Sequence, residues 1–250
     1  MSKAKSARHA KILAELVSSP SLRIADLARL HGVAAETIRR DLDELTRAGL
    51  LNRTYGGAVK AAPAEPMVSE RHLLYVHERE QIAARAVAEL KGAKTLFVGS
   101  GSTTVHIARR MAAELKDLTV LTHSFGVATV LAHNPRIKVI VLPGEYQASE
   151  GAMVGAQCLD FIRKFNVDWT ILGASGIGIE GPSEALIECS AVYSGMAARA
   201  QQVMIAADHS KFNLIYPGQY LTWAQVDCLI CDQAPPVELS SCIGAGKLRL

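Results

Sequence analysis

Arginines clustered early in the chain offer the chemistry of nucleic-acid binding. Arg39 and Arg40 lie in the segment TIRRDLDEL, and Arg53 follows in LLNRTYGGA. Guanidinium groups bind phosphate oxygens and guanine edges through paired hydrogen bonds, so arginine is widely used to read DNA. The hydroxyl of Thr37 can anchor a phosphate at the same place. These side chains can bind DNA together if one element presents them on one face.

The spacing of apolar residues predicts that this element is a helix. Ile38, Leu42 and Leu45 recur at i, i+4 and i+7 and therefore share one stripe, with Arg40 and Arg47 pointing nearly opposite. Two similar stripes upstream predict two more helices: Ile12, Leu13, Leu16 and Val17, then Ile24, Leu27 and Ala28. Three helices with a glycine-containing turn at residues 31–34 fit the helix-turn-helix pattern, whose last helix enters the major groove.

A short strand is expected directly after the third helix. Gly49 is a good helix stop, and Leu51 to Tyr55 has strand character, with Arg53 and Tyr55 on one face. Gly56 and Gly57 are expected to supply the positive φ angles of a hairpin turn. The sequence thus predicts a winged helix-turn-helix domain over residues 1–60, whose wing holds the DNA backbone or minor groove.

The charge distribution favours the same interpretation. Residues 1–60 contain 11 Lys and Arg against 6 Asp and Glu, a net charge of +5, whereas the whole chain carries +3. The remaining residues therefore sum to −2. A basic patch on one small domain is typical of phosphate-backbone binding. The alternative, a three-helix module that docks another protein, leaves Arg39, Arg40 and Arg53 without a task.

A second motif, GSGSTT after the apolar run TLFV, offers phosphate binding. Glycines let the backbone approach a ligand, and the helix that starts there directs its free N–H groups and dipole at the same point. The candidate contacts in this loop are Ser100, Gly101, Ser102, Thr103 and Thr104. A tight strand-to-helix turn capped by a hydroxyl, with no ligand, is the alternative.

The rest of the chain predicts the frame for that loop. Apolar runs at Thr95–Val98, Leu118–Leu121, Lys138–Leu142, Trp169–Leu172, Val203–Ala207 and Cys228–Cys231 alternate with helical segments. Strands separated by helices indicate an α/β fold with a mostly parallel sheet, which we place at residues 78–235. Residues 61–77 are expected to be a linker, and residues 236–250 a loosely ordered tail.

Ligands in such sheets bind at the carboxyl ends of the strands, so the polar residues that follow strands are further candidates for effector binding. They are His123, Ser124, Gly144, Glu145, Asp208 and Lys211. A lone histidine is more often a hydrogen-bonded structural residue and a lone lysine a solvated charge. Their repeated placement after strands favours a pocket for a small, polyhydroxylated, phosphorylated molecule.

Other features of the sequence indicate a cytoplasmic protein without a metal or cofactor. The basic N-terminus has no apolar run behind it, and no stretch approaches the ~18–20 apolar residues of a membrane span. Five cysteines are an odd number, which fits reduced thiols. Cys228 and Cys231 form an isolated C-x-x-C in an apolar run, which favours buried strand thiols over a metal or redox site.

The segments TIRRDLDEL and AGLLNRTYGGA closely resemble the N-terminal module of the DeoR family of bacterial transcriptional regulators. In that family TIRRDL lies on the recognition helix. The chain departs from the family pattern at Ala34 and Ala35, where the family usually has serine, and at Tyr55 in the wing. A missing helix cap costs about 0.5–2 kcal/mol.

The body resembles the DeoR-family effector domain from about Glu78 to Asp232, through GSGSTT, LTVLTHS, VDWTILGASGI and AADHSKF. The resemblance implies that this domain binds phosphorylated sugars or related metabolites and controls operator binding. Three positions depart from the family: Gly99 replaces a frequent aspartate, His123 replaces the usual asparagine, and Pro143 stands where a second glycine is common.

GSGSTT and D-x-S-K also resemble ribose-5-phosphate isomerase, so a sugar-phosphate isomerase fused to a DNA-binding head is the alternative function. Such an enzyme needs a carboxylate base after the strand that begins near Trp169, where this chain reads GASGIG. Glu180, Glu184 and Glu188 lie near in sequence. A protein-docking scaffold is a third class.

We therefore expect no catalytic residues. The interpretation is a repressor of a carbohydrate-utilisation operon that binds double-stranded operator DNA as a dimer or tetramer.

Overall fold

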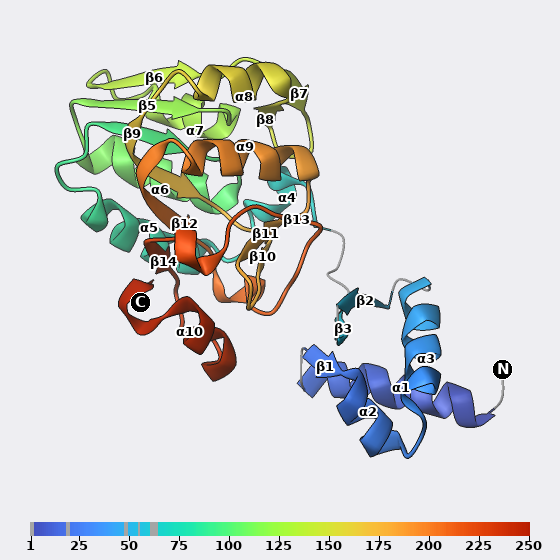
Figure 1. Ribbon diagram of the computed structural model, residues 1–250. Coiled ribbons are helices and arrows are strands. Elements are labelled where there is room, and N and C mark those ends of the chain that lie inside the picture. Colours follow the sequence, from blue (N-terminus) through green and yellow to red (C-terminus); the bar gives the residue numbers. More distant parts are fainter. Residues whose placement is uncertain (1–2, 19–20, 48–49, 55, 61–64) are drawn as a thin grey trace. The chain divides into compact units, whose positions relative to one another are not determined.

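The computed structural model describes residues 3–18, 21–47, 50–54, 56–60 and 65–250 (Figure 1). The chain separates into two compact units, residues 1–64 and 65–250. The segment predicted as a linker is therefore divided between them. Its second half carries helix α4 (Val68–Arg71) and the start of α5 (Val76–Glu89), both in the second unit.

The N-terminal unit is a winged helix. Its helices are α1 (Lys3–Ser18), α2 (Ile24–His31) and α3 (Ala35–Arg47), and its wing is the hairpin of β2 (Leu51–Thr54) and β3 (Gly57–Lys60). The predicted apolar stripes form its core, since the following side chains are buried: Ile12, Leu16, Ile24, Leu27, Ile38, Leu42 and Leu45. Gly32, in the left-handed conformation at φ 62°, ends α2 and turns the chain into α3.

The sequence did not indicate one strand of this unit. β1 (Ser21–Arg23) pairs antiparallel with β3, which gives a three-stranded sheet in the order β1-β3-β2. Gly57 is needed for this close pairing, because a Cβ atom there would lie 1.8 Å from the carbonyl oxygen of Leu22. The expected positive φ at Gly57 is wrong, since its φ lies outside that region. Tyr55, at the predicted turn, lies outside the described residues.

The second unit is built on a seven-stranded sheet in the order β15-β14-β12-β9-β4-β5-β6, and every neighbouring pair is parallel. Its strands are β4 (Thr95–Val98), β5 (Leu118–Thr122), β6 (Ile137–Val141), β9 (Val167–Leu172), β12 (Ala200–Ala206), β14 (Cys228–Ile230) and β15 (Leu248–Arg249). All six predicted strands are present, within a few residues of the expected bounds. The predicted α/β class is thereby confirmed.

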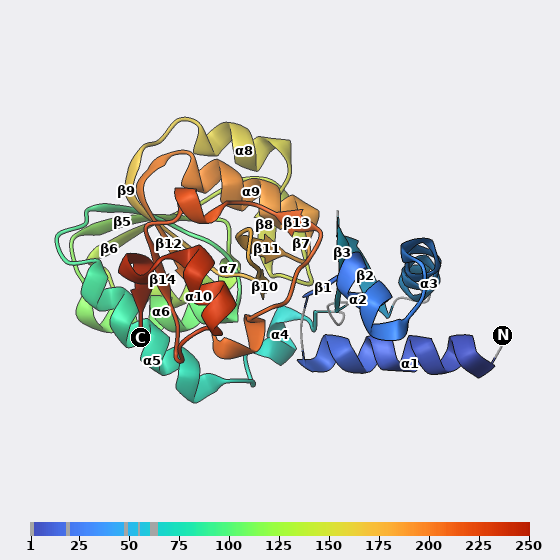
Figure 2. The same ribbon diagram turned by 60° about the horizontal axis from the view of Figure 1, so that its bottom comes forward.

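Helices cover both faces of the sheet, and the strand residues alternate between them. Phe97 and Ile205 pack under α8 (Ala156–Ile162), α9 (Ile187–Ala197) and α10 (Val237–Ile243). Leu96 and Met204 pack against α5, α6 (Ser102–Glu114) and α7 (Phe125–Leu131) on the other face. Figure 2 shows α8 and α9 on one side of the sheet and α5 and α6 on the other. Burial on both faces explains why the strands are continuous apolar runs rather than alternating patterns.

The order of the strands fixes where a ligand can bind. From β4, the chain builds outward through β5 to β6, then returns to add β9, β12 and β14 on the other side of β4. The connections after β4 and β9 therefore diverge to opposite faces of the sheet. In open parallel sheets such a reversal point leaves a crevice at the carboxyl ends of the two strands, where ligands bind.

Shorter strands and turns sit at the edges of the sheet. β7 (Glu145–Gln147) and β8 (Ala152–Val154) form a hairpin, and β10 (Gly176–Ile177), β11 (Pro182–Glu184) and β13 (Gly218–Gln219) form a small antiparallel sheet. The single-turn helices are η1 (His209–Lys211), η2 (Trp223–Gln225) and η3 (Ala245–Lys247).

The expectation of a loosely ordered tail is wrong. Residues 237–243 form α10, whose Leu239 and Ile243 are buried in the core, and β15 completes the sheet as an edge strand. The helix is only seven residues long, and its serines together with the glycines that follow it, Gly244 and Gly246, led to the expectation of loose order. Among the described residues, no helix combines the length and the apolar character that a membrane crossing requires.

The C-x-x-C pair behaves as buried thiols. Cys228, the first residue of β14, and Cys231, which follows that strand, are 2% and 0% exposed, and both are free cysteines. Burial raises the pKa of Cys228 to about 12 and raises that of Cys231 as well, which keeps both thiols protonated and unreactive at neutral pH.

Candidate functional site

The recognition helix presents its arginines to solvent, as predicted. The side chains of Arg39 and Arg40 are 53% and 77% exposed, and each lies near Glu36, at 3.2 and 3.8 Å. Arg47 is also exposed and donates from Nε to the carbonyl oxygen of Asp43. Thr37 is half-buried in the first turns of the helix. Exposed ion pairs of this kind contribute little free energy, so an incoming phosphate can exchange with Glu36.

Arg53 on the wing is less free than the helix arginines. One of its terminal nitrogens donates to Asp43 Oδ1 at 2.5 Å and to the carbonyl oxygen of Arg39 at 3.1 Å, and the side chain is 29% exposed. The residue therefore fastens the wing to α3, a role that the sequence did not indicate. Contact of its remaining nitrogens with a DNA backbone stays a prediction.

A buried polar cluster fixes the recognition helix in place. Asp41 lies on the inner face of α3, 1% exposed, and accepts two hydrogen bonds from Arg8 at 2.5 and 3.1 Å and one from His9 at 3.0 Å. Burial by itself raises the pKa of Asp41, but the hydrogen bonds from Arg8 and His9 outweigh it and hold the pKa below its usual value. Asp41 thus ties α1 to α3 as a carboxylate.

A pocket in the second unit lies where the strand order reverses. It has about 310 Å³ of empty space when its open mouth is included. The loops after β4, β9 and β12 contribute to it, together with the segment that precedes α4 and strand β11. Its lining residues are Glu65, Arg71, Ser100, Gly101, Ser102, Thr103, Glu150, Gly173, Ala174, Ser175, Glu184, Tyr193 and Lys211.

The GSGSTT loop forms one wall of this pocket. Gly101 has φ 112°, a conformation that side chains rarely adopt, and it directs the chain into α6. The first N–H groups of α6 have no acceptor within the helix. Thr104 Oγ1 donates to the carbonyl oxygen of Gly101 and is fully buried, so it closes the first turn of the helix and leaves Ser102 and Thr103 nearer the pocket.

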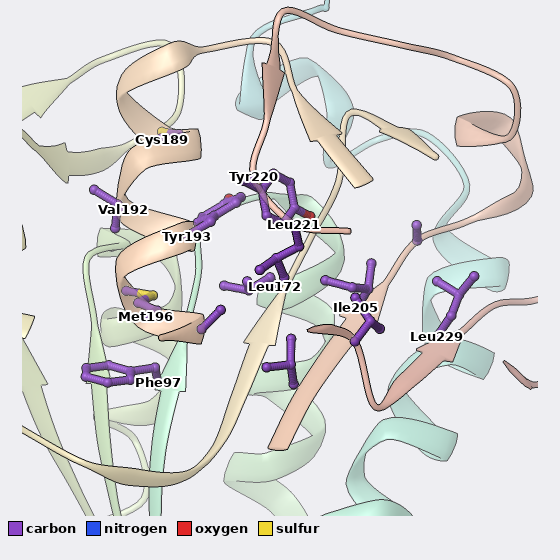
Figure 3. Close-up of a cluster of buried hydrophobic side chains, with 14 of the residues drawn as sticks. Phe97, Leu172, Cys189, Val192, Tyr193, Met196, Ile205, Tyr220, Leu221 and Leu229 are labelled. Carbon is purple, nitrogen blue, oxygen red and sulfur yellow. The ribbon is translucent and has the colours of Figure 1, made fainter. Parts of the chain in front are cut away.

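Gly99 stands at the position where the resembling family often has aspartate, and here a side chain has no room. A Cβ atom would lie 2.9 Å from Tyr193 Cε1. Tyr193 reaches from α9 toward the strand ends, where it meets Tyr220 edge-on, as Figure 3 shows. Its hydroxyl donates to the carbonyl oxygen of Ser100 at 2.9 Å. Tyr193 therefore stabilises the GSGSTT loop through this hydrogen bond.

His123 also stabilises the GSGSTT loop. It is 0% exposed, and burial lowers its pKa to about 4, so the ring is neutral at pH 7. Its Nδ1 lies 2.8 Å from the carbonyl oxygen of Met153 and its Nε2 lies 3.0 Å from the N–H of Ser100. The carbonyl can only accept and the N–H can only donate, which defines the Nδ1–H tautomer. Both nitrogens are occupied, so the ring has no free hydrogen-bonding atom for a ligand.

Lys211 reaches the pocket from η1. Asp208, fully buried, caps this helix by accepting from the N–H and hydroxyl of Ser210, and it pairs with the buried Arg79 at 3.3 Å. Lys211 Nζ lies 2.9 Å from Glu65 Oε1, with its side chain 15% exposed. Asp208 thus positions the lysine rather than lining the pocket.

The pocket contains a second cation and three carboxylates. Arg71 contacts Glu150 Oε2 at 2.6 Å and Glu65 Oε2 at 3.3 Å, and all three side chains are under 10% exposed. Burial lowers the pKa of Arg71, but Glu150 and Glu65 outweigh that effect and raise it overall. Carboxylate oxygens of Glu65, Glu150 and Glu184 lie within 4.8 Å of one another.

Glu184 is neutral at pH 7. Burial first, and then the charges of Glu65 and Glu150, raise its pKa to about 8. Ser175 Oγ lies 2.6 Å from Glu184 Oε1 and also contacts Glu65, and it accepts from the N–H of Ala185. A hydroxyl has one proton to donate. The consistent arrangement has protonated Glu184 donating to Ser175, which donates to the carboxylate of Glu65.

The structure brings together some of the predicted effector contacts and separates others. Ser100, Gly101, Ser102, Thr103 and Lys211 line the pocket. Ser124 caps α7, and Gly144 and the exposed Glu145 belong to the hairpin of β7 and β8. Ser124, Gly144 and Glu145 follow β5 and β6, which lie on the opposite side of β4 from the point where the strand order reverses.

The sequence analysis missed Glu65, Arg71, Glu150 and Ser175, and it named Glu184 only as a carboxylate near the isomerase-like loop. The first two fall in the segment taken as a linker, and Glu150 lies in the connection from β7 to β8. The loop after the fourth predicted strand was set aside because it lacks a carboxylate, yet Ser175 comes from that loop. Glu184 returns to the same place on β11. The signal that could have identified Ser175 was the position of its loop at the end of a strand.

A basic winged helix joined to a parallel α/β unit with an anion-binding loop is the architecture of a DNA-binding regulator with a sensor domain. Residues 8–63 match the DeoR-like helix-turn-helix domain, and residues 75–233 match the DeoR C-terminal sensor domain. The chain belongs to the DeoR family of transcriptional regulators.

Named relatives are transcriptional repressors. The chain is 30% identical over 248 residues to the HTH-type transcriptional repressor CsqR of Escherichia coli K12, covering 97% of this chain and 94% of that protein. It is 28% identical to the glycerol-3-phosphate regulon repressor of the same organism, with 97% of each chain covered. A putative aga operon transcriptional repressor of Escherichia coli O157:H7 is 27% identical over 238 residues.

Solved structures of ribose 5-phosphate isomerases share part of the fold. The Methanocaldococcus jannaschii enzyme aligns with 54% of this chain and 53% of its own, at 19% identity and a TM-score of 0.38. The Plasmodium falciparum enzyme gives 19% identity and a TM-score of 0.39, covering 54% and 52%. Likeness at this level says nothing about activity.

Proposed function

We propose that this protein represses a carbohydrate-utilisation operon and that a phosphorylated sugar or related metabolite binds the sensor pocket and controls its affinity for operator DNA. The observation that carries the proposal is the convergence of Lys211, Arg71 and the N-terminus of α6 on one pocket. Two cations and free helix N–H groups together favour a phosphoryl group. The relatives named as repressors of a glycerol-3-phosphate regulon and an aga operon support this ligand class.

On the DNA side, we propose that Thr37, Arg39 and Arg40 contact the major groove and that Arg47, Arg53 and Tyr55 contact the backbone or minor groove. A recognition helix reads only a few base pairs, so such regulators act on repeated half-sites as symmetric oligomers. A homodimer or homotetramer acting in the cytoplasm, where the operator lies, is the form we propose.

Glu184 favours a second candidate function, sugar-phosphate isomerisation. The structure returns a buried carboxyl group with a pKa of about 8 to the pocket, which the absence of a carboxylate in GASGIG did not predict. A proton-transfer base must be free to take a proton from the substrate, however, and Glu184 is buried and held by Ser175 and by the N–H of Ala185. Binding without turnover is the function that this arrangement supports better.

One experiment separates these functions. An operator fragment would be selected from random-sequence DNA by the full-length protein, and its affinity measured with and without a panel of sugar phosphates. The same mixtures would be followed for isomerised product. A ligand that shifts DNA affinity without turnover supports the proposal. Turnover supports the isomerase, and no effect from any sugar phosphate rejects a phosphate-sensing role.

Two variants test the division of labour between the units. Arg40→Ala is expected to weaken operator binding by about 1–3 kcal/mol if the side chain reaches a base edge, whereas Arg163→Ala, an exposed arginine in the sensor unit, leaves it unchanged. Thr103→Val removes one hydroxyl near the phosphate position. It is expected to raise the effector concentration for half-maximal response roughly tenfold, since a hydrogen bond to a charged group contributes about 1.5–3 kcal/mol, and to spare operator affinity without effector.

A further inference from the structure

The carboxylate of Glu65 lies against the two cations that line the sensor pocket. It accepts from Lys211 Nζ at 2.9 Å and from the hydroxyl of Ser175, and it lies 3.3 Å from an Arg71 nitrogen. The side chain is 7% exposed. Lys211 and Arg71 are the cations that an effector phosphate would use, so Glu65 and the phosphate compete for the same partners.

The charges in the pocket make this competition exclusive. Arg71 and Lys211 contribute two positive charges, Glu65 and Glu150 contribute two negative charges, and Glu184 is neutral at pH 7. The charges in the pocket sum to zero only while the Glu65 carboxylate is present. A phosphate dianion beside Glu65 and Glu150 would leave a net charge of −2 in a buried space, where like charges are poorly screened. With Glu65 withdrawn, one positive charge is left to attract the anion.

The position of Glu65 in the chain connects the pocket to the DNA-binding unit. Four residues, 61–64, separate it from the last residue of β3 in the wing. The next described anchor of this segment is Pro66, whose carbonyl oxygen accepts from Arg71 Nη1 at 3.2 Å, and Val68 follows, whose N–H donates to the carbonyl oxygen of Ser149 at 2.9 Å. Withdrawal of Glu65 therefore moves the first described attachment of the sensor unit one residue further along the chain, and three residues further where Arg71 also leaves Pro66 to bind the phosphate.

We infer that Glu65 is an internal latch: the effector's phosphate displaces its carboxylate from Lys211, Arg71 and Ser175, and this release of the segment next to the wing lowers operator affinity. The inference rests on the proposed function. Each released residue adds up to ~3.3–3.6 Å to the tether that carries the head. A longer tether positions the two DNA-binding units of an oligomer less precisely, so they bind two half-sites together less effectively.

A cation is the competing occupant, because the oxygens of Glu65, Glu150 and Glu184 lie close enough to share one. Arg71 and Lys211 already neutralise this group, and a metal ion would add positive charge beside them. The geometry therefore favours exchange of one anion for another over the addition of a metal.

The test compares the full-length protein with Glu65→Gln and with Glu70→Gln, a change at an exposed glutamate on the same segment. The probe is inorganic phosphate at pH 7, titrated by calorimetry. Amide hydrogen exchange of the peptide that spans residues 65–70 is followed in parallel. Tryptophan fluorescence verifies that the variants are folded, since Trp169 and Trp223 both lie in the sensor unit.

Glu65→Gln is expected to bind phosphate at least fivefold more tightly than the parent, and Glu70→Gln within twofold of it. Phosphate is expected to accelerate exchange in residues 65–70 of the parent, and Glu65→Gln to exchange fast without phosphate. Normal phosphate binding with unchanged or slower exchange in this segment overturns the latch and leaves the proposed function standing. Absence of binding by phosphate and by every sugar phosphate, in parent and variant alike, rejects both, and tighter binding of Mg²⁺ than of phosphate rejects the latch in favour of a cation site.

Discussion

Both units pair the cations that we propose to bind anions with internal carboxylates, but the two sets of ion pairs differ in burial. On the recognition helix, Arg39 and Arg40 pair with Glu36, and all three side chains are more than half exposed. In the sensor pocket, Arg71 pairs with Glu65 and Glu150 below 10% exposure. Water already solvates the first set, so opening it costs little, whereas the second set must be replaced partner for partner.

The difference corresponds to two kinds of recognition. A DNA backbone presents many phosphates to a surface that stays wet, and the affinity is strongly dependent on salt. A single metabolite in a buried pocket meets a fixed number of partners, so charge balance decides what can enter. The proposed DNA contact of the head and the proposed anion exchange in the pocket follow this division.

The largest expected effect comes from breaking the buried set. Arg71→Met leaves Glu150 and Glu65 without their shared cation and is expected to lower the free energy of unfolding of the sensor unit by about 3–5 kcal/mol. Urea unfolding followed by the fluorescence of Trp169 and Trp223 measures it. Arg163→Met is the matched control, since its pair with Asp160 is about 70% exposed and contributes at most about 1 kcal/mol. Equal losses of unfolding free energy in the two variants would mean that burial does not determine how much an ion pair contributes to stability.

A smaller effect is expected from Glu184, and it depends on pH. Its folded-state pKa of about 8 lies above the ordinary value, so the native state keeps a proton that the unfolded chain releases. That contribution to stability is complete below the ordinary pKa and is lost as pH rises toward 8. Between pH 6 and pH 8 the loss amounts to about 2 kcal/mol.

Glu184→Gln should therefore flatten the dependence of unfolding free energy on pH between 6 and 8. The measurement is urea unfolding of parent and variant at pH 6, 7 and 8, and the difference between them removes the contribution of histidines that titrate nearby. Parallel curves for the two proteins would show that Glu184 is ionised in the native protein.

The smallest effect is expected on the wing. Asp43→Asn removes the partner of Arg53 Nη1 in a pair whose carboxylate is 54% exposed, so the stability of the head should change by only about 0.2–1 kcal/mol. Calorimetric melting in low and high salt measures it, and the difference should shrink as salt screens the pair. A loss of stability as large as that of Arg71→Met would show that this exposed ion pair contributes as much as the buried ion pairs.

Sequence reasoning predicted the helices of the head and the exposure of their arginines well, because its signals are local. Helical spacing identified Ile38, Leu42 and Leu45 as the inner face of α3, and the exposed arginines followed from the same period. It missed β1, since three residues without periodicity become a strand only through pairing with β3. It also missed Asp41, whose burial is possible only because Arg8 and His9 reach it from another helix.

The pocket divides in the same way. The loop GSGSTT was recognisable because glycines, hydroxyls and a helix start are contiguous in the chain. Ser124, Gly144 and Glu145 were expected beside it because each follows a strand, yet strand order sets their loops on the far side of β4. Spacing along the chain does not state where the strand order reverses, and the pocket lies at that reversal, at the ends of β4 and β9.

The amino-acid sequence alone determined the division into a basic winged helix and a parallel α/β body, together with the presence of a phosphate-type loop. These features arise from periodicity, turn chemistry and charge over short stretches. Only the tertiary structure decided that Glu65 meets Lys211, 146 positions away, and that Glu184 loses its charge beside it. Burial and long-range neighbours set both outcomes, because a carboxylate's partners and its pKa depend on which elements the fold packs around it.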